Sequence, residues 1–191
     1  SFLFIAIAYG FANPATHFVE NKGQWHADVL FKAGIPGGDL YVLKNKLKYV
    51  FYEKNQKGHH HGVFDEDGSA LRSASIEPDI SGFQQAVEVE FVGANSGALI
   101  IGENIYFSGI NFIKHTGQSS AGVRSFSKVK VTDLYPGIDL ILYANEAGIK
   151  YDLVVGVGAD PAIIKMKYDG QNSMFVQDGR LSINTIFGQF N

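Results

Sequence analysis

Apolar and polar residues alternate in short runs along most of the chain, and this alternation predicts β-strands. The clearest run covers residues 86–91, where valine and phenylalanine occupy one face and glutamate the other. Residues 149–155 show the same period of two. Turn signals such as Asp178-Gly179 separate the runs about every 8–12 residues. The pattern therefore predicts an all-β fold, an antiparallel β-sandwich or barrel-like domain of about a dozen short strands with little or no helix.

Residues 135–161 are the most informative stretch, because two alternating strands are joined there by a tight turn at residues 145–148. Pairing about this turn places Asp139 and Asp152 near each other on the outward face. Two carboxylates at a set distance are what glycoside hydrolysis requires. However, Asp139 follows a Pro-Gly turn and Asp160 precedes a proline, where such side chains cap backbone donors. We interpret these aspartates as structural, with catalysis as the alternative.

Two segments lack a clear period. Residues 112–125 contain His115, Gly117 and Gly122 and are expected to form mostly loop. Residues 55–85 are rich in glycine, serine and histidine, and a structureless loop of this length is uncommon in a compact domain. We therefore expect one β-rich domain over residues 13–191, in which 55–85 is either an insertion or a boundary between two strand groups.

The long loop also carries the residues with the most obvious affinity for metals. His59, His60 and His61 are adjacent, and imidazole binds zinc, copper or nickel. Three consecutive side chains in a loop cannot easily face one ion, so we interpret them as a solvated polar loop, with weak metal binding as the alternative. The acidic run at residues 65–68 fails the spacing of a calcium loop. No cofactor is expected, and no catalytic residue is assigned.

Composition narrows the function classes further. The chain has 191 residues, 46% of them apolar, and a formal net charge of -3. A mildly acidic domain of this kind is a poor partner for nucleic acid, which is bound through phosphate neutralisation. The absence of cysteine excludes disulfides, thiol catalysis and thiolate metal sites.

The first residues bear on localisation. Residues 2–11 are apolar and uncharged, too short to span a bilayer, and similar in length to the hydrophobic region of a signal peptide. We therefore expect residues 1–12 to be a signal-peptide remnant with cleavage after Ala12. The mature protein would then be secreted or exposed at the cell surface. A buried N-terminal strand is the alternative.

The single tryptophan, Trp25, and the many tyrosines allow two readings. Aromatic faces can stack on the apolar faces of sugars, which would make Trp25 part of a glycan-binding surface. A tryptophan can equally anchor the core of a domain.

Three segments together resemble a known family: residues 18–25 (FVENKGQW), residues 89–95 (VEFVGAN) and residues 134–161. They are similar to an uncharacterised N-terminal all-β domain of large exported proteins of gliding bacteria. That domain often precedes β-propeller (SBBP) repeats, and a C-terminal sorting domain of the type IX secretion and gliding-motility kind often follows. The chain departs from the family at residues 110–113 and 119–123, where an aromatic segment is altered and a tryptophan is missing.

The resemblance implies a non-catalytic extracellular module with a structural or adhesive role, because we know of no catalytic residue in that family. Its expected partners are other domains of the same polypeptide, together with surface glycans or proteins, and neither nucleic acid nor a membrane span is expected. The alternative is a carbohydrate-binding or polysaccharide-processing accessory domain. We expect the chain to be part of a longer multidomain protein.

Overall fold

A computed structural model describes residues 5–7, 16–53, 82–113, 119–145 and 148–190. The described chain consists of antiparallel strands and a short 3-10 turn, η1 (Pro161–Ile163), with no α-helix, which confirms the predicted all-β class. The larger sheet contains β1 (Ile5–Ile7), β2 (Phe18–Glu20), β3 (Phe31–Ile35), β4 (Gly38–Val42), β5 (Lys46–Tyr52), β6 (Gln84–Phe91), β7 (Leu99–Ile113), β8 (Ser119–Tyr135), β9 (Ile138–Asn145), β10 (Gly148–Val155) and β11 (Met166–Asp169). The smaller sheet contains β12 (Ser173–Gln177), β13 (Arg180–Thr185) and β14 (Gly188–Phe190).

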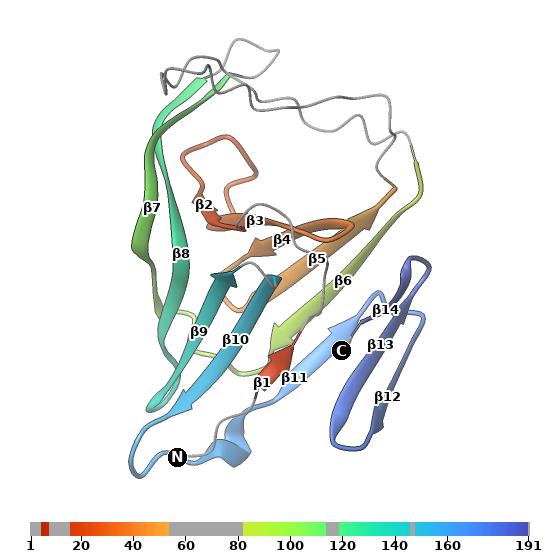
Figure 1. The fold of residues 1–191 in the computed structure, drawn as a ribbon. Coiled ribbons are helices and arrows are strands. Elements are labelled where there is room, and N and C mark those ends of the chain that lie inside the picture. The colour runs from red at the N-terminus through yellow and green to blue at the C-terminus, as the bar shows by residue number, and fades with distance from the viewer. Residues whose placement is uncertain (1–4, 8–15, 54–81, 114–118, 146–147, 191) are drawn as a thin grey trace.

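The larger sheet curls into a half-barrel (Figure 1). Its strands follow the order β1-β10-β9-β8-β2-β3-β4-β5-β6-β11, and β7 pairs with β8 beside this path. The branch point is β8, which pairs with β7 over most of its length, with β2 at Ser125 and Phe126, and with β9 from Lys128 onward. Because β8 belongs to both halves of the sheet, the apolar faces of the two halves turn toward each other.

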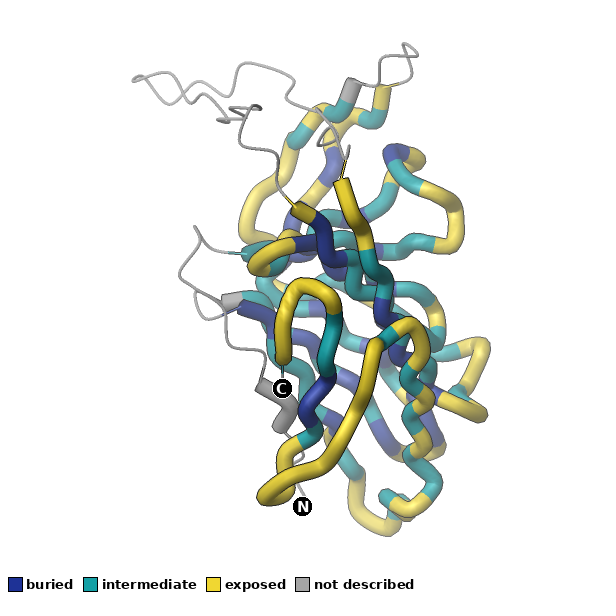
Figure 2. Tube along the Cα trace, turned by 90° about the vertical axis from the view of Figure 1, so that its right-hand side faces the viewer, coloured by how far each residue is buried: buried dark blue, intermediate teal, exposed yellow. Residues whose placement is uncertain are grey.

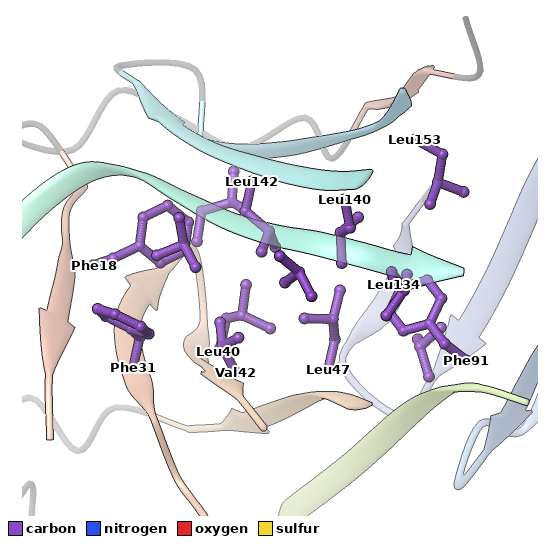
Figure 3. Packing of buried hydrophobic residues seen from close by; sticks show 14 of the residues in the cluster. Phe18, Phe31, Leu40, Val42, Leu47, Phe91, Leu134, Leu140, Leu142 and Leu153 are labelled. Carbon is purple, nitrogen blue, oxygen red and sulfur yellow. The ribbon is translucent and has the colours of Figure 1, made fainter. Parts of the chain in front are cut away.

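The core fills the space between these two faces (Figure 3). Phe18 and Phe31 lie at one end of the core, and Phe91 and Leu134 lie at the other. Burial of each large apolar side chain contributes about 1.5–3 kcal/mol, so this cluster is the main source of stability. The side chains that are almost completely buried include Phe18, Leu40, Val42, Leu47, Val87, Phe91, Val123, Val129, Leu134, Ile138, Leu140 and Leu142.

Several local expectations are confirmed. The alternation in β6 buries Val87, Val89 and Phe91 and leaves the two intervening glutamates partly exposed. Strands β4 and β5 pair as a hairpin, and Leu43 N–H donates to the Lys46 carbonyl at its turn. The strands β9 and β10 pair in unbroken register around the predicted turn at residues 145–148.

The expectation of a loop over residues 112–125 is wrong within the described part of the chain. There β7 runs to Ile113 and β8 begins at Ser119, so most of this region is paired strand. Three register shifts between β7 and β8, together with the positive φ of Gly109 (100°) and Gly122 (64°), interrupt the alternation of side chains. A regular period of two is lost wherever a bulge inserts a residue, and this hid both strands in the sequence.

A second bulge bends β8 close to its C-terminal end. The register between β8 and β9 shifts between Val131 and Tyr135, and Asp133 adopts a positive φ of 52°. A non-glycine residue in this conformation is uncommon and needs local support. The Asp139 side chain supplies it, because Oδ1 accepts the Asp133 N–H at 2.8 Å.

The smaller sheet packs against the inward face of β5 and β6, near the start of β6, and extends the core there. Its buried Ile183 contacts Phe51 and Val87, while β12 is exposed along its whole length (Figure 2). The predicted turn at Asp178-Gly179 is confirmed, since both residues have positive φ, 51° and 74°. Two consecutive positive values are typical of the type I′ turn that a two-residue hairpin prefers.

Strand β1 pairs antiparallel with β10, and Ile5 lies opposite Asp152. This pairing does not test cleavage after Ala12, which stays a prediction. Strands β5 and β6, which flank the long glycine- and histidine-rich segment, pair directly with each other. No helix in the described residues is long and apolar enough to cross a bilayer.

Candidate functional site

The predicted carboxylates of residues 135–161 were the first candidates for a site. Asp139 lies opposite Val154 and Asp152 lies opposite Ile141, so both aspartates project from the outer face of the sheet at diagonal positions. Diagonal neighbours on a sheet are about 7–8 Å apart, a spacing that two catalytic carboxylates can have. The strand register therefore places the two aspartates near each other, as predicted, and the contacts of each side chain decide its role.

Asp139 is fully engaged by its neighbours. One carboxylate oxygen accepts the backbone N–H of Asp133, and the other lies 2.9 Å from Lys130 Nζ. Burial would raise the pKa of Asp139, but the N–H and the ammonium group outweigh it, so that the pKa lies below its ordinary value. A carboxylate held ionised in this way stabilises the β8 bulge and is a poor proton donor.

The other two aspartates also have structural partners. Asp160 caps η1, since its Oδ1 accepts the Ala162 N–H at 2.9 Å. Asp152 forms a hydrogen bond with the Tyr143 hydroxyl, and the pKa of Tyr143 is raised, first by burial and then by the Asp152 charge. The predicted role of Asp160 as a cap is confirmed.

The segment of residues 21–29 forms a loop built around Asn21. The Asn21 amide donates to the carbonyls of His26 (2.9 Å) and Val29 (2.8 Å). Its oxygen accepts the N–H groups of Gly23 and Trp25 at 3.0 and 3.1 Å. The Asn21 side chain thus forms hydrogen bonds with the backbone at both ends of the loop and determines where Trp25 lies.

This loop is joined to the tip of the β7–β8 hairpin, about 100 residues later in the chain. Lys22 Nζ donates to the Gly122 carbonyl at 2.8 Å, and the Ser120 hydroxyl donates to the Lys22 carbonyl at 3.0 Å. The Phe112 ring meets Trp25 edge-on with the ring centroids 5.8 Å apart. The first family-like segment and the altered aromatic segment therefore meet in space, which the sequence did not indicate.

An ion pair between the largely buried Glu20 carboxylate and the half-exposed Arg124 holds the same junction together. Arg124 donates from Nη2 to Glu20 Oε2 at 2.7 Å and from its backbone N–H to Oε1 at 2.9 Å. Lys22 Nζ lies 3.2 Å from the same carboxylate. Burial opposes ionisation of Glu20, but the Arg124 and Lys22 contacts outweigh it and the pKa of Glu20 is lowered.

On the outer face of β3–β5, beside this junction, a charged and aromatic cluster is centred on Lys32. Lys32 Nζ lies 3.1 Å from Asp39 Oδ2, 5.6 Å from the Trp25 ring centroid and 5.3 Å from the Tyr41 ring centroid. The Tyr52 hydroxyl donates to the same Asp39 oxygen at 3.0 Å, and burial raises the pKa of Tyr52. We call these five residues the Lys32 cluster. Its ammonium group lies within cation–π distance of two rings.

The Lys32 cluster bears on both interpretations of Trp25. The indole is half-buried and is absent from the main core cluster, so it is not a central core anchor. Trp25 lies on the outer face of the sheet, where its ring and the Lys32 ammonium group meet above the buried Asp39 carboxylate. The sequence did not single out Lys32, Asp39, Tyr41 or Tyr52, because only strand pairing brings them together.

Strand β7 carries a further set of exposed side chains that the sequence did not indicate. Five large apolar side chains are exposed there, and we call them the β7 strip: Leu99, Ile101, Ile105, Tyr106 and Phe107. Tyr106 stacks on His17, with the ring centroids 3.4 Å apart. Ile105, Tyr106 and Phe107 are consecutive, and successive strand residues point to opposite faces, so the β7 strip exposes apolar side chains on both sides of the strand.

The predicted weak metal ligands His59, His60 and His61 lie outside the described residues, as does the acidic run at 65–68. Within the described ranges, no group of three or more histidine, aspartate or glutamate side chains is arranged to hold a metal ion. Metal binding by the histidines stays an untested alternative.

Comparison with known proteins identifies a family but no characterised relative. No curated protein matches the chain, and no solved structure matches it. A family model described as a domain of unknown function, DUF7948, matches residues 18–191, which include the Asn21 loop, the β7–β8 hairpin and every strand of the two sheets except β1. The chain therefore belongs to the DUF7948 family of domains of unknown function.

Proposed function

We propose that this domain is a non-catalytic structural or adhesive module of an exported multidomain protein. The supporting observation is that three of its carboxylates form structural contacts. Glu20 binds Arg124, and Asp139 accepts the Asp133 N–H at the bulge of β8. Glu88 binds both Lys46 (2.6 Å) and Lys48 (3.2 Å). An enzyme that cleaves glycosidic bonds needs one carboxylic acid kept protonated, whereas the pKa values of these three groups are lowered.

The proposed cellular location and domain context are inferred from the sequence. The apolar segment 2–11 supports export, and the resemblance described above supports a place ahead of β-propeller (SBBP) repeats in a protein that carries a type IX sorting domain. We therefore propose a location outside the cell or at its surface. Mass spectrometry of the protein purified from its native host tests this, because the mature chain is expected to begin at Asn13. A mature chain that retains Phe2 would contradict it.

Glycan binding at the Lys32 cluster is the second candidate, favoured by the exposed part of Trp25 beside Lys32 and Tyr41. Because Trp25 is the only tryptophan, its fluorescence reports on this surface alone. A sugar that stacks on the indole would shift the emission, and the matched variant Tyr106→Ala, on the separate β7 strip, would respond as the wild type does.

One panel of polysaccharides tests both candidates and the enzymatic alternative. The structural proposal expects no release of reducing ends from any member of the panel. Release that Asp152→Asn abolishes while the variant remains folded would overturn it. A saturable change in Trp25 fluorescence without release of reducing ends would select glycan binding as the activity.

A further inference from the structure

Strand β7 has one edge with no partner strand in the described part of the chain. It pairs with β8 on one side only and lies outside the path of the main sheet. It is also 15 residues long. An unpaired edge presents a row of backbone N–H and C=O groups that can pair with another strand, and proteins usually protect such edges with lysine, proline or bulges.

Only the first part of β7 lacks this protection. Residues 99–103 pair with β8 in unbroken register, opposite residues 132–128. Beyond them the edge is irregular, because Asn104 and Gly109 have positive φ (55° and 100°) and the register shifts three times. The regular segment contains neither lysine nor proline, and its Leu99 and Ile101 are 61% and 40% exposed.

The regular segment is complementary to itself. In an antiparallel two-fold pairing centred on Ile101, Ile101 faces its own copy, Leu99 faces Glu103 and Ile100 faces Gly102. The only charged residue is Glu103, which is already neutralised by Lys128 of its own chain at 3.2 Å. A pairing centred on Glu103 would instead oppose two carboxylates, and like charges directly opposite each other destabilise a sheet.

We propose that residues 99–103 are a docking edge for a second copy of this chain, which pairs antiparallel about Ile101 and joins two half-barrels into one continuous sheet. The two-fold arrangement is isologous, so each backbone contact occurs twice. The outer faces of both copies lie on the same side, where Ile101 meets Ile101 of the other copy. Because only five residues per copy take part, the dimer is weak and forms at high protein concentration or when the chains are held close together.

Cysteine cross-linking tests the register. The chain has no cysteine, so Ile101→Cys introduces a single thiol on the proposed two-fold axis. Opposite Cα atoms in an antiparallel pair are about 4.5–5.5 Å apart, within the range that a disulfide bridges. Leu99→Cys is the matched control, because in this register it lies about 13 Å from its own copy. With oxidised glutathione, Ile101→Cys should give covalent dimers and Leu99→Cys should remain monomeric. Equal cross-linking of the two variants, or none by Ile101→Cys, would overturn the proposal.

Sedimentation equilibrium tests the association without a cross-link. The wild type should dimerise as its concentration increases, and Ile101→Lys should shift the dissociation constant at least tenfold toward monomer, because it places two ammonium groups face to face. Val154→Lys is the control, since Val154 is 42% exposed on β10, away from the β7 edge. It should dimerise as the wild type does. A wild type that stays monomeric at millimolar concentration, or a dimer that Ile101→Lys leaves unchanged, would show that this edge does not bind a second copy.

Discussion

Replacing Gly102 with alanine tests whether the curled sheet requires glycine at this position. Gly102 lies in β7 on the core side of the sheet, against the ring of Phe126 in the neighbouring strand. A Cβ atom built on Gly102 would lie 2.5 Å from two ring carbons and 2.7 Å from a third. Ordinary contacts begin at 3.4 Å, so the ring would have to move by about 0.9 Å.

The surroundings of Phe126 oppose that movement. The ring is 3% exposed, meets Phe31 edge-on at 5.9 Å, and has the Arg124 guanidinium 5.3 Å from its centroid. Overpacking a filled core costs about 1–3 kcal/mol. The alanine offsets part of this, since it lowers the conformational entropy of the unfolded chain by about 0.4–1 kcal/mol. We therefore expect Gly102→Ala to destabilise the fold by about 1–2 kcal/mol.

Urea unfolding followed by Trp25 fluorescence measures the effect. With a slope of about 2–3 kcal/mol/M for a chain of this size, the midpoint should fall by about 0.3–1 M. Gly34→Ala is the matched control, because Gly34 lies in β3, also lacks a positive φ, and has no atom within 4 Å of an added Cβ. Its midpoint should stay the same or rise.

A double-mutant cycle identifies the cause. Phe126→Leu leaves room for the added methyl group, so Gly102→Ala should be less costly in that background, by about 1 kcal/mol. If Gly102→Ala unfolds at the same midpoint as Gly34→Ala, or if its cost is the same beside leucine, then contact with the Phe126 ring is not what requires glycine here.

The remaining predictions concern pH. The pKa values of Glu20, Glu88 and Asp139 are lowered in the folded state, so their contribution to stability is complete above the unfolded values of 4.5, 4.5 and 3.8 and is lost as the pH falls through the folded values. The urea midpoint should therefore be level from about pH 7 to 5 and should fall below about pH 4.5. The fall should be less steep in Glu20→Gln. An equal midpoint at pH 3.5 and 7 would refute this. Burial raises the pKa values of Tyr49 and Tyr151, so the stability linked to them is present below pH 10 and is lost as the pH rises. In an alkaline absorbance titration these tyrosines should ionise only on unfolding, and smooth titration of all nine tyrosines in the folded state would contradict their burial.

The local features of this protein could be predicted from its sequence alone. Alternation in residues 86–91 identified the inward face of β6, and Asp178-Gly179 identified a hairpin turn, because each depends only on neighbouring residues. The three family-like segments lie within the residues that the DUF7948 model matches. The interpretation of Asp160 as a capping residue also followed from its immediate neighbours and was confirmed.

Which strands meet, and therefore which residues form the surfaces, could be seen only in the folded protein. The bulges in β7 and β8 removed the periodicity of those strands, so the longest edge of the sheet could not be found from the pattern. Lys32, Asp39, Tyr41 and Tyr52 form one cluster because β3, β4 and β5 pair in one register, and that register is set by burial of their opposite faces. Asp139, on β9, supports the bulge in β8 because the pairing of these two strands places its side chain beside the Asp133 N–H. Alternation is a property of neighbours along the chain, whereas the docking edge and the Lys32 cluster depend on contacts between segments that the sequence keeps apart.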